Sequence, residues 1–265
     1  MTSAGHLGLV VALCALASPL FAADGVLVVE RTTSGTDTRT SQIQIEAQRM
    51  RAETNTGGRV QTVIFDGTTQ VLWIIDNTRK SYMEMTKADA DKMGGQMSAM
   101  MAQMQEQLKN MPPAARAQME AMMKGRGMPG PGAIAKTEYR RSGADQVGKW
   151  TCAKYDGFRN NEKTSEVCTV DPKELGFSEA DFAVSRQLAE FFRAIVPQNA
   201  DLFSIGTPEA QGYSGVPVRR INAVGPGQTV SEIVEVKRET FPDSLFVVPA
   251  GFQRQAMPMM GAPGR

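Results

Sequence analysis

Short runs of alternating apolar and polar residues, separated by tight turns, dominate this sequence. Residues 60–65 lie between an Asn-Thr-Gly-Gly segment at 55–58 and the dipeptide Asp66-Gly67, and residues 80–85 follow a turn at 76–78. Alternation with a period of two is typical of a strand with one covered face. Because turns this short join antiparallel neighbours, the pattern predicts an antiparallel meander.

The same pattern recurs along most of the chain. We predict further strands at residues 24–33, 40–51, 70–76, 135–142, 147–156, 164–170, 216–224 and 229–240, and a final short strand at 246–252. Sheets with this many strands normally curl, and helices with an apolar face need a wall to cover. The sequence therefore predicts an α+β fold, a curved antiparallel sheet or half-open β-barrel with helices covering its concave face.

A methionine-rich helical hairpin is predicted at residues 87–124, where it interrupts the strands. Twelve of the chain's 17 methionines lie between Met83 and Met128. Apolar side chains recur there at steps of three and four, which is the period of one helix face. They are Met93, Met97, Met100, Met101, Met104 and Leu108, followed after Pro112-Pro113 by Met119, Met122 and Met123. We predict that these nine side chains form a lid over the concave face.

Two pairs of polar residues mark the starts of helices. Thr86 with Asp89 precedes the methionine-rich segment, and Ser178 with Asp181 precedes a second amphipathic segment. A hydroxyl residue followed three positions later by an acidic one can cap a helix N-terminus. The second segment carries an apolar stripe at Val184, Leu188, Phe191, Phe192 and Ile195 before Pro197 ends it. We expect this helix to cover the same face of the sheet.

Both ends of the chain are predicted to lie outside the folded domain. Residues 1–22 read as a secretory signal peptide, because an apolar run at 7–21 precedes Ala22. That run of about 15 residues is shorter than the ~20 needed to cross a bilayer as a helix. Residues 253–265, rich in Met, Pro and Gly, are predicted to be a disordered tail. A single half-barrel domain remains at 23–252, with a Gly/Pro linker at 125–133, and the protein is expected to be periplasmic or secreted after cleavage near Ala22.

Signal cleavage would remove His6, the only histidine, together with Cys14. A mature chain without histidine has no imidazole base and no Ser-His-Asp or Cys-His pair, so we expect no enzyme and no cofactor. The formal net charge of +1 gives no reason to expect a nucleic-acid partner.

The two remaining cysteines, Cys152 and Cys168, are predicted to form a disulfide. They lie equally far from Asn160, on the two strands of a predicted hairpin, so they would face each other across it. An even pair of cysteines in an exported chain is usually a structural disulfide.

Several segments together resemble an exported Gram-negative family, domain of unknown function 4412. The likeness lies in Phe65-Asp66-Gly67 leading to Trp73-Ile74-Ile75-Asp76, in Lys80-Ser81-Tyr82-Met83-Glu84-Met85, in the methionine-rich helix and in residues 246–252. That family is thought to resemble the periplasmic lipoprotein carriers of the LolA/LppX-like half-barrel superfamily, whose curved sheet and lid helices enclose a pocket for acyl chains. The resemblance implies ligand binding by analogy and brings no active site with it.

Three classes of function fit these features. The first is a non-catalytic carrier of a hydrophobic ligand, either a lipid or a lipidated protein, because methionine suits a cover over a variable chain. The same methionines could instead fill an ordinary core. The second is soft-metal binding, with thioethers of Met97, Met100, Met101 and Met104 gathered around Cu(I). The third is a structural or partner-binding role in the cell envelope.

Overall fold

A computed structural model describes residues 23–112, 114–115, 118, 137–193, 195, 212–222 and 227–257. Its strands are β1 (Ala23–Ser34), β2 (Asp37–Ile45), β3 (Arg49–Thr56), β4 (Arg59–Asp66), β5 (Val71–Asp76), β6 (Ser81–Thr86), β7 (Glu138–Val147), β8 (Trp150–Arg159), β9 (Glu162–Val170), β10 (Val216–Asn222), β11 (Thr229–Phe241) and β12 (Gln253–Gln255). They form one sheet in the order β12-β6-β5-β4-β3-β2-β1-β11-β10-β9-β8-β7.

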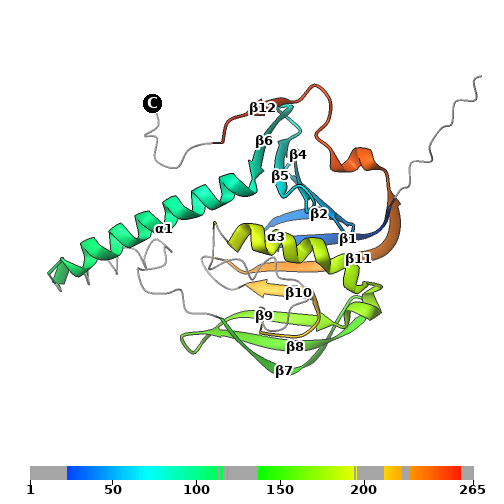
Figure 1. Cartoon of the computed structure of the whole chain (residues 1–265). Helices are drawn as coiled ribbons and strands as arrows, with labels where there is room; N and C mark the ends of the chain where they lie inside the picture. The colour runs from blue at the N-terminus through cyan, green and yellow to red at the C-terminus, as the bar shows by residue number, and fades with distance from the viewer. Residues whose placement is uncertain are drawn as a thin grey trace, which may run out of the picture.

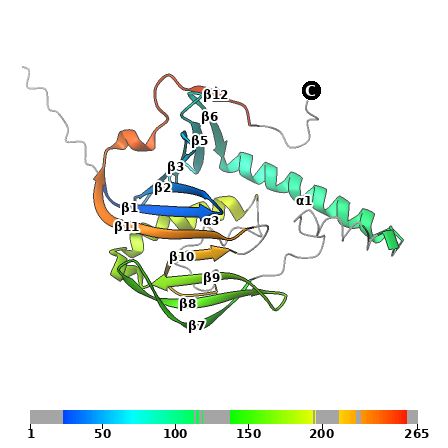
Figure 2. The same cartoon turned by 180° about the vertical axis from the view of Figure 1, so that it is seen from behind.

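The sheet is strongly curved and does not close (Figures 1 and 2). Neighbouring strands are antiparallel except at one edge, where β12 pairs with β6 in parallel. The predicted α+β fold with a curved antiparallel sheet is therefore confirmed. Strands β1 and β11 lie at the centre of the sheet and join a half containing β2–β6 to a half containing β7–β10.

One predicted strand, residues 40–51, is wrong because a turn divides it into β2 and β3. The backbone N–H of Glu46 donates to the carbonyl of Arg49 over 2.8 Å, and the Arg49 guanidinium lies 2.6 Å from a Glu46 carboxylate oxygen. Burial raises the pKa of Glu46, although Arg49 opposes this shift. An ion pair therefore holds a turn that contains no Gly or Pro, and the alternating pattern runs through it without interruption.

The end of the chain also differs from the prediction. Residues 246–252 form no strand: a 3-10 helix, η4 (Asp243–Phe246), is followed by a turn. The disorder predicted from residue 253 is wrong for Gln253–Gln255, which forms β12. The backbone N–H of Gln253 donates to the Lys80 carbonyl, and the pairing with β6 follows from there.

Two helices begin where the capping residues predict. Before α1 (Lys87–Lys109), the N–H of Thr86 donates to Asp89 Oδ2 over 3.0 Å and the N–H of Asp89 donates to Thr86 Oγ1 over 3.2 Å. Asp181 Oδ2 accepts from both the N–H and the hydroxyl of Ser178, before η2 (Glu179–Phe182) and α3 (Ala183–Arg193). Neither α-helix has the length and apolarity of a transmembrane helix.

The main core lies on the concave face, where α3 crosses the sheet (Figure 1). Val184 and Phe191 of α3 are fully buried, and the Phe191 ring packs edge-to-face on Phe65 of β4 with 5.5 Å between centroids. Ala90, in the first turn of α1, is also fully buried. These contacts bring α3 against the concave face of the sheet.

A second, smaller core lies on the convex face. It contains Leu27, Ile64, Ile75, Phe241 and Phe246, and the chain from η4 to Phe252 packs on it. Strands β4–β6 are therefore covered from outside by the segment that follows β11, and their other face is turned toward α3 and the start of α1.

Candidate functional site

A row of five apolar side chains crosses the concave face of β2–β6. In consecutive pairs of antiparallel strands, Ile43 lies opposite Ala52, Ala52 opposite Val63, Val63 opposite Ile74, and Ile74 opposite Met83. Directly opposed residues share one face of a sheet, so these side chains are neighbours. All five are half-buried. We call this set the apolar row.

The apolar row is the outermost layer of the concave core. Two residues further along each strand, on the same face, lies a deeper row consisting of Ile45, Met50, Phe65, Leu72 and Met85. Phe65 and Leu72 in that row are each 1% exposed, because α3 packs over it. Ile43, Val63 and Ile74 pack against the same core with part of their surface still accessible. Four of the five side chains in the deeper row are thus buried, whereas the apolar row stays partly open.

Polar side chains follow the apolar row in the other direction along the strands. Gln61, Asp76 and Ser81 lie on the same face, two residues beyond Val63, Ile74 and Met83 respectively. A pocket of about 120 Å³ lies at this boundary and is lined by Ile74 and Met83 as well as by these three polar residues; Arg79, Tyr82 and Gln255 complete it. The boundary is therefore hollowed, with apolar and polar walls.

A second pocket, of about 300 Å³, lies at the adjoining hairpin ends. It is lined by Arg59, Val60, Gln61, Asp76, Thr78 and Arg79. Arg79 Nε lies 3.7 Å from Asp76 Oδ2, and these two side chains are 76% and 42% exposed. The two pockets share Gln61, Asp76 and Arg79, so they adjoin each other.

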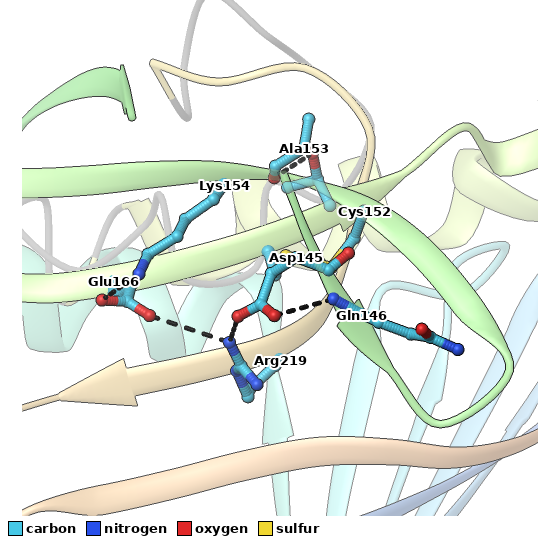
Figure 3. The surroundings of a disulfide bond; sticks show 9 residues. Asp145, Gln146, Cys152, Ala153, Lys154, Glu166 and Arg219 are labelled. Atoms are coloured by element: carbon cyan, nitrogen blue, oxygen red, sulfur yellow. Dashed lines mark hydrogen bonds and ion pairs between the residues drawn. A yellow bond between two sulfur atoms is a disulfide. The ribbon is translucent and has the colours of Figure 1, made fainter. Parts of the chain in front are cut away.

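Paired charges lie near the disulfide on the half of the sheet that contains β7–β10 (Figure 3). Lys154 Nζ lies 3.1 Å from Glu166 Oε2, and the Arg219 guanidinium contacts Asp145 and lies 3.7 Å from Glu166 Oε1. Burial alone would raise the pKa of Glu166, but hydrogen bonds from Lys163 and Lys154 keep it below its ordinary value. The Arg219 hydrogen bond likewise lowers the pKa of Asp145. These charges are therefore matched within the protein.

The predicted disulfide between Cys152 and Cys168 is confirmed. Their Cα atoms are 5.4 Å apart, and both side chains are at most 2% exposed. The expected register is wrong, however, because Cys168 lies opposite Lys154 and not opposite Cys152. An irregularity between Gly157 and Phe158 shifts the pairing, so the bond runs diagonally between β8 and β9.

The structure describes only some of the methionines predicted to form the lid. Met93 is half-buried against the main core, and Met97 is half-buried one turn later. Met100 is 64% exposed and does not cover the sheet, because α1 leads away from it beyond its first turns (Figures 1 and 2). The side chains of Met101, Met104 and Leu108, and residues Met119, Met122 and Met123, lie outside what the structure describes. The lid and the Cu(I) alternative at Met97, Met100, Met101 and Met104 stay predictions.

Sequence reasoning missed the apolar row and the arginine-lined pocket. The sequence does carry a signal for the row, since Ile43, Val63, Ile74 and Met83 all fall on apolar positions of alternating strands. Which of those positions become neighbours depends on the register of four strand pairs. Arg59 and Arg79 come from different hairpins and are brought together only by the turns.

Comparison with protein families identifies the chain's relatives. The family model described as Domain of unknown function (DUF4412) matches residues 84–252, well over half of the 265 residues. The chain belongs to this family. The resemblance stated from the sequence is thereby confirmed. No curated protein sequence matches the DUF4412 protein.

Three solved structures are similar to the DUF4412 protein at low identity. An uncharacterized conserved protein from Thermus thermophilus is 9% identical with a TM-score of 0.44, over 89% of this chain and 92% of that one. A chain in the Pseudomonas aeruginosa MucA/MucB complex is 11% identical with a TM-score of 0.38, over 84% and 55%. A chain of the structure of MucB in complex with MucA(peri) is 11% identical with a TM-score of 0.37, over 87% of this chain and 56% of that one. The DUF4412 protein spans about half the length of the last two chains.

Proposed function

We propose that this protein binds a hydrophobic ligand, the acyl chain of a lipid or of a lipidated protein, along the apolar row. The observation that carries the proposal is the row itself, in which five opposed apolar side chains on five adjacent strands remain half-buried beside a hollowed polar boundary. A sheet that needed only a core would gain by covering this row, since each buried CH₂ group contributes about 0.8 kcal/mol.

The length of the apolar row suits an acyl chain. Neighbouring strands lie about 4.8 Å apart, so the four steps from Ile43 to Met83 span roughly 19 Å. An acyl chain in one leaflet occupies about half of the ~30 Å hydrocarbon core of a bilayer, roughly 15 Å. A ligand of this length can therefore lie across β2–β6 with its whole chain on apolar side chains.

Methionines at one end of the row suit a ligand of variable length. Met83 ends the row on β6, and Met93 and Met97 lie half-buried where α1 leaves the sheet. Methionine is unbranched and polarizable, so it adapts to differently shaped apolar partners. In this proposal the apolar row is the fixed floor of the site, α3 borders it, and the methionines at the base of α1 are its adjustable wall.

The proposed role is non-catalytic and belongs outside the cytoplasm. The disulfide between Cys152 and Cys168 supports an oxidising compartment, because such bonds persist mainly in exported proteins. The signal peptide predicted at residues 1–22 points the same way. A periplasmic protein that holds an acyl chain would shield it from water between two membranes.

Binding of dodecanol, an uncharged alkyl chain, tests the proposal by calorimetric titration of the purified protein. Ile74→Glu places a charge in the middle of the apolar row and is expected to weaken binding at least tenfold, because an unpaired charge would have to be desolvated under the ligand. Val247→Glu is the matched control, since Val247 is 54% exposed on the segment that covers the convex face. No binding of dodecanol, or an equal loss in both variants, would contradict the proposal.

A further inference from the structure

The two pockets beyond the apolar row change in character along one direction. The smaller one is walled on one side by Ile74 and Met83 of the row, and on the other by Gln61, Asp76 and Ser81. The larger one continues past Gln61 and Asp76 to Arg59 and Arg79. Along β4 to β6, the side chains on this face therefore change within a few residues from apolar to polar and then to cationic.

The two arginines give the larger pocket a net positive charge. Arg59 and Arg79 face a single acidic residue there, Asp76. Among the described residues no carboxylate forms an ion pair with Arg59, and Arg79 contacts Asp76 only at 3.7 Å. Asp76 Oδ1 also accepts a hydrogen bond from the backbone N–H of Arg79 over 2.9 Å, so the turn already uses part of its capacity. Most of the donors of both guanidinium groups remain available.

Guanidinium groups bind carboxylate and phosphate oxygens in pairs of hydrogen bonds. A volume of about 300 Å³ is at the lower end of the range for small-molecule sites, which is enough for a headgroup. A ligand lying on the apolar row with its polar end toward Gln61 would bring that end to Arg59 and Arg79. The order of the side chains thus matches an amphiphile with one anionic end.

We infer that the ligand is an anionic amphiphile, with its acyl chain on the apolar row and its phosphate or carboxylate headgroup bound between Arg59 and Arg79. This inference rests on the proposed function, because it assigns the headgroup end of the same site. Arg59 lies at the start of β4, and Arg79 lies in the turn between β5 and β6, so two tight turns place the backbones of both residues at the hairpin ends that line this pocket.

Calorimetric titration with three probes, namely dodecyl phosphate, dodecanol and inorganic phosphate, tests the inference. Dodecyl phosphate is expected to bind about tenfold more tightly than dodecanol, and its affinity alone is expected to fall with added salt. In Arg59→Gln/Arg79→Gln, dodecyl phosphate is expected to lose about tenfold in affinity while dodecanol binding stays unchanged, which also shows that the variant is folded. Inorganic phosphate alone is expected to bind at least tenfold more weakly than dodecyl phosphate.

Arg31→Gln is the matched control, because Arg31 is an exposed arginine of the same sheet whose side chain points to the opposite face from Val28 and Ile43. It is expected to leave all three affinities unchanged. Equal affinities for dodecanol and dodecyl phosphate, or a loss in Arg31→Gln equal to that in the double variant, would overturn the inference and leave the proposed function standing. Binding of inorganic phosphate as tightly as dodecyl phosphate would overturn the inference too, because the alkyl chain would then add nothing to the affinity. If neither alkyl probe binds, the proposed function itself fails.

Discussion

Gly25 lies where β1 passes closest to its neighbours. A Cβ atom there would lie 2.6 Å from the Ile45 carbonyl oxygen and 2.7 Å from the Phe241 ring. The carbonyl belongs to the backbone of the sheet and cannot rotate away as a side chain could. We expect Gly25→Ala to lower the free energy of unfolding by about 1 to 3 kcal/mol, as overpacked cores do, and urea unfolding measures this loss.

Gly95→Ala is the matched control for Gly25→Ala. Gly95 lies within α1, and a Cβ atom there would meet nothing within 4 Å. The substitution is expected to stabilise by about 0.5 to 1 kcal/mol, because alanine loses less backbone entropy in a helix. Wild-type stability in Gly25→Ala would contradict the packing described for β1.

The disulfide between Cys152 and Cys168 is expected to stabilise the folded protein. Cys152→Ala/Cys168→Ala is expected to lose about 3 kcal/mol of unfolding free energy, because the reduced chain gains loop entropy when unfolded. Denaturant unfolding with and without dithiothreitol measures this loss of unfolding free energy. The reductant should destabilise the wild type by the same amount and leave the double variant unchanged. A reductant effect of equal size in both proteins would show that the bond is not its cause.

The pairing of Cys152 with Cys168 was predictable from the sequence, but the geometry of the disulfide was not. Removing Cys14 with the signal peptide leaves two cysteines, so only one partner exists for each. The diagonal arrangement depends on the irregularity in strand pairing at Gly157 and Phe158, which no residue type at these positions predicts. Gln187 is a comparable case, because its buried Oε1 atom lies against Gly67 only after α3 has docked on the sheet.

At the scale of elements, the start of α1 depends on one carboxylate. Hydrogen bonds from the side chain and the backbone of Thr86 lower the pKa of Asp89 below its ordinary value of 3.8. Because the folded-state pKa is the lower one, this stabilisation is complete above the unfolded-state pKa and is lost as pH falls through the folded-state pKa. Asp89→Ala is expected to lose about 1 kcal/mol at neutral pH, as lost helix caps do.

Thermal unfolding at a series of pH values measures the Asp89 effect. The difference in melting temperature between the wild type and Asp89→Ala should shrink as the pH is lowered below about 4. Asp91→Ala is the control, since Asp91 is an exposed residue of the same helix paired only with Lys87 among the described residues. A difference between wild type and Asp89→Ala that stays constant with pH would mean that the charge on Asp89 contributes nothing.

Elements with local signals were predictable and those that depend on distant pairing were not. Thr86 with Asp89 and Ser178 with Asp181 mark helix starts through contacts within three residues. The strand predicted at 40–51 contains a turn held by an ion pair, which alternation cannot reveal. Strand β12 exists only because it pairs with β6, some 170 residues earlier in the chain, so composition alone indicated disorder.

At the scale of the whole molecule, the curved sheet followed from the number of strands and the shortness of their turns. The apolar row on β2–β6 did not, because it depends on the register of four strand pairs. Only that row indicates where a hydrophobic ligand could lie. It also moves the proposed contacts away from most of the methionine helix and onto the sheet itself.

Methyl NMR of the protein labelled at isoleucine and methionine, recorded while dodecanol is added, shows directly whether a ligand lies on the apolar row. Ile43, Ile74 and Met83 belong to the row, whereas Ile64 and Ile75 lie in the core of the convex face on the same strands. We predict saturable shifts of the first three methyl signals and none of the last two. Unchanged signals from the apolar row at saturating dodecanol, or shifts confined to Ile64 and Ile75, would contradict binding at this site.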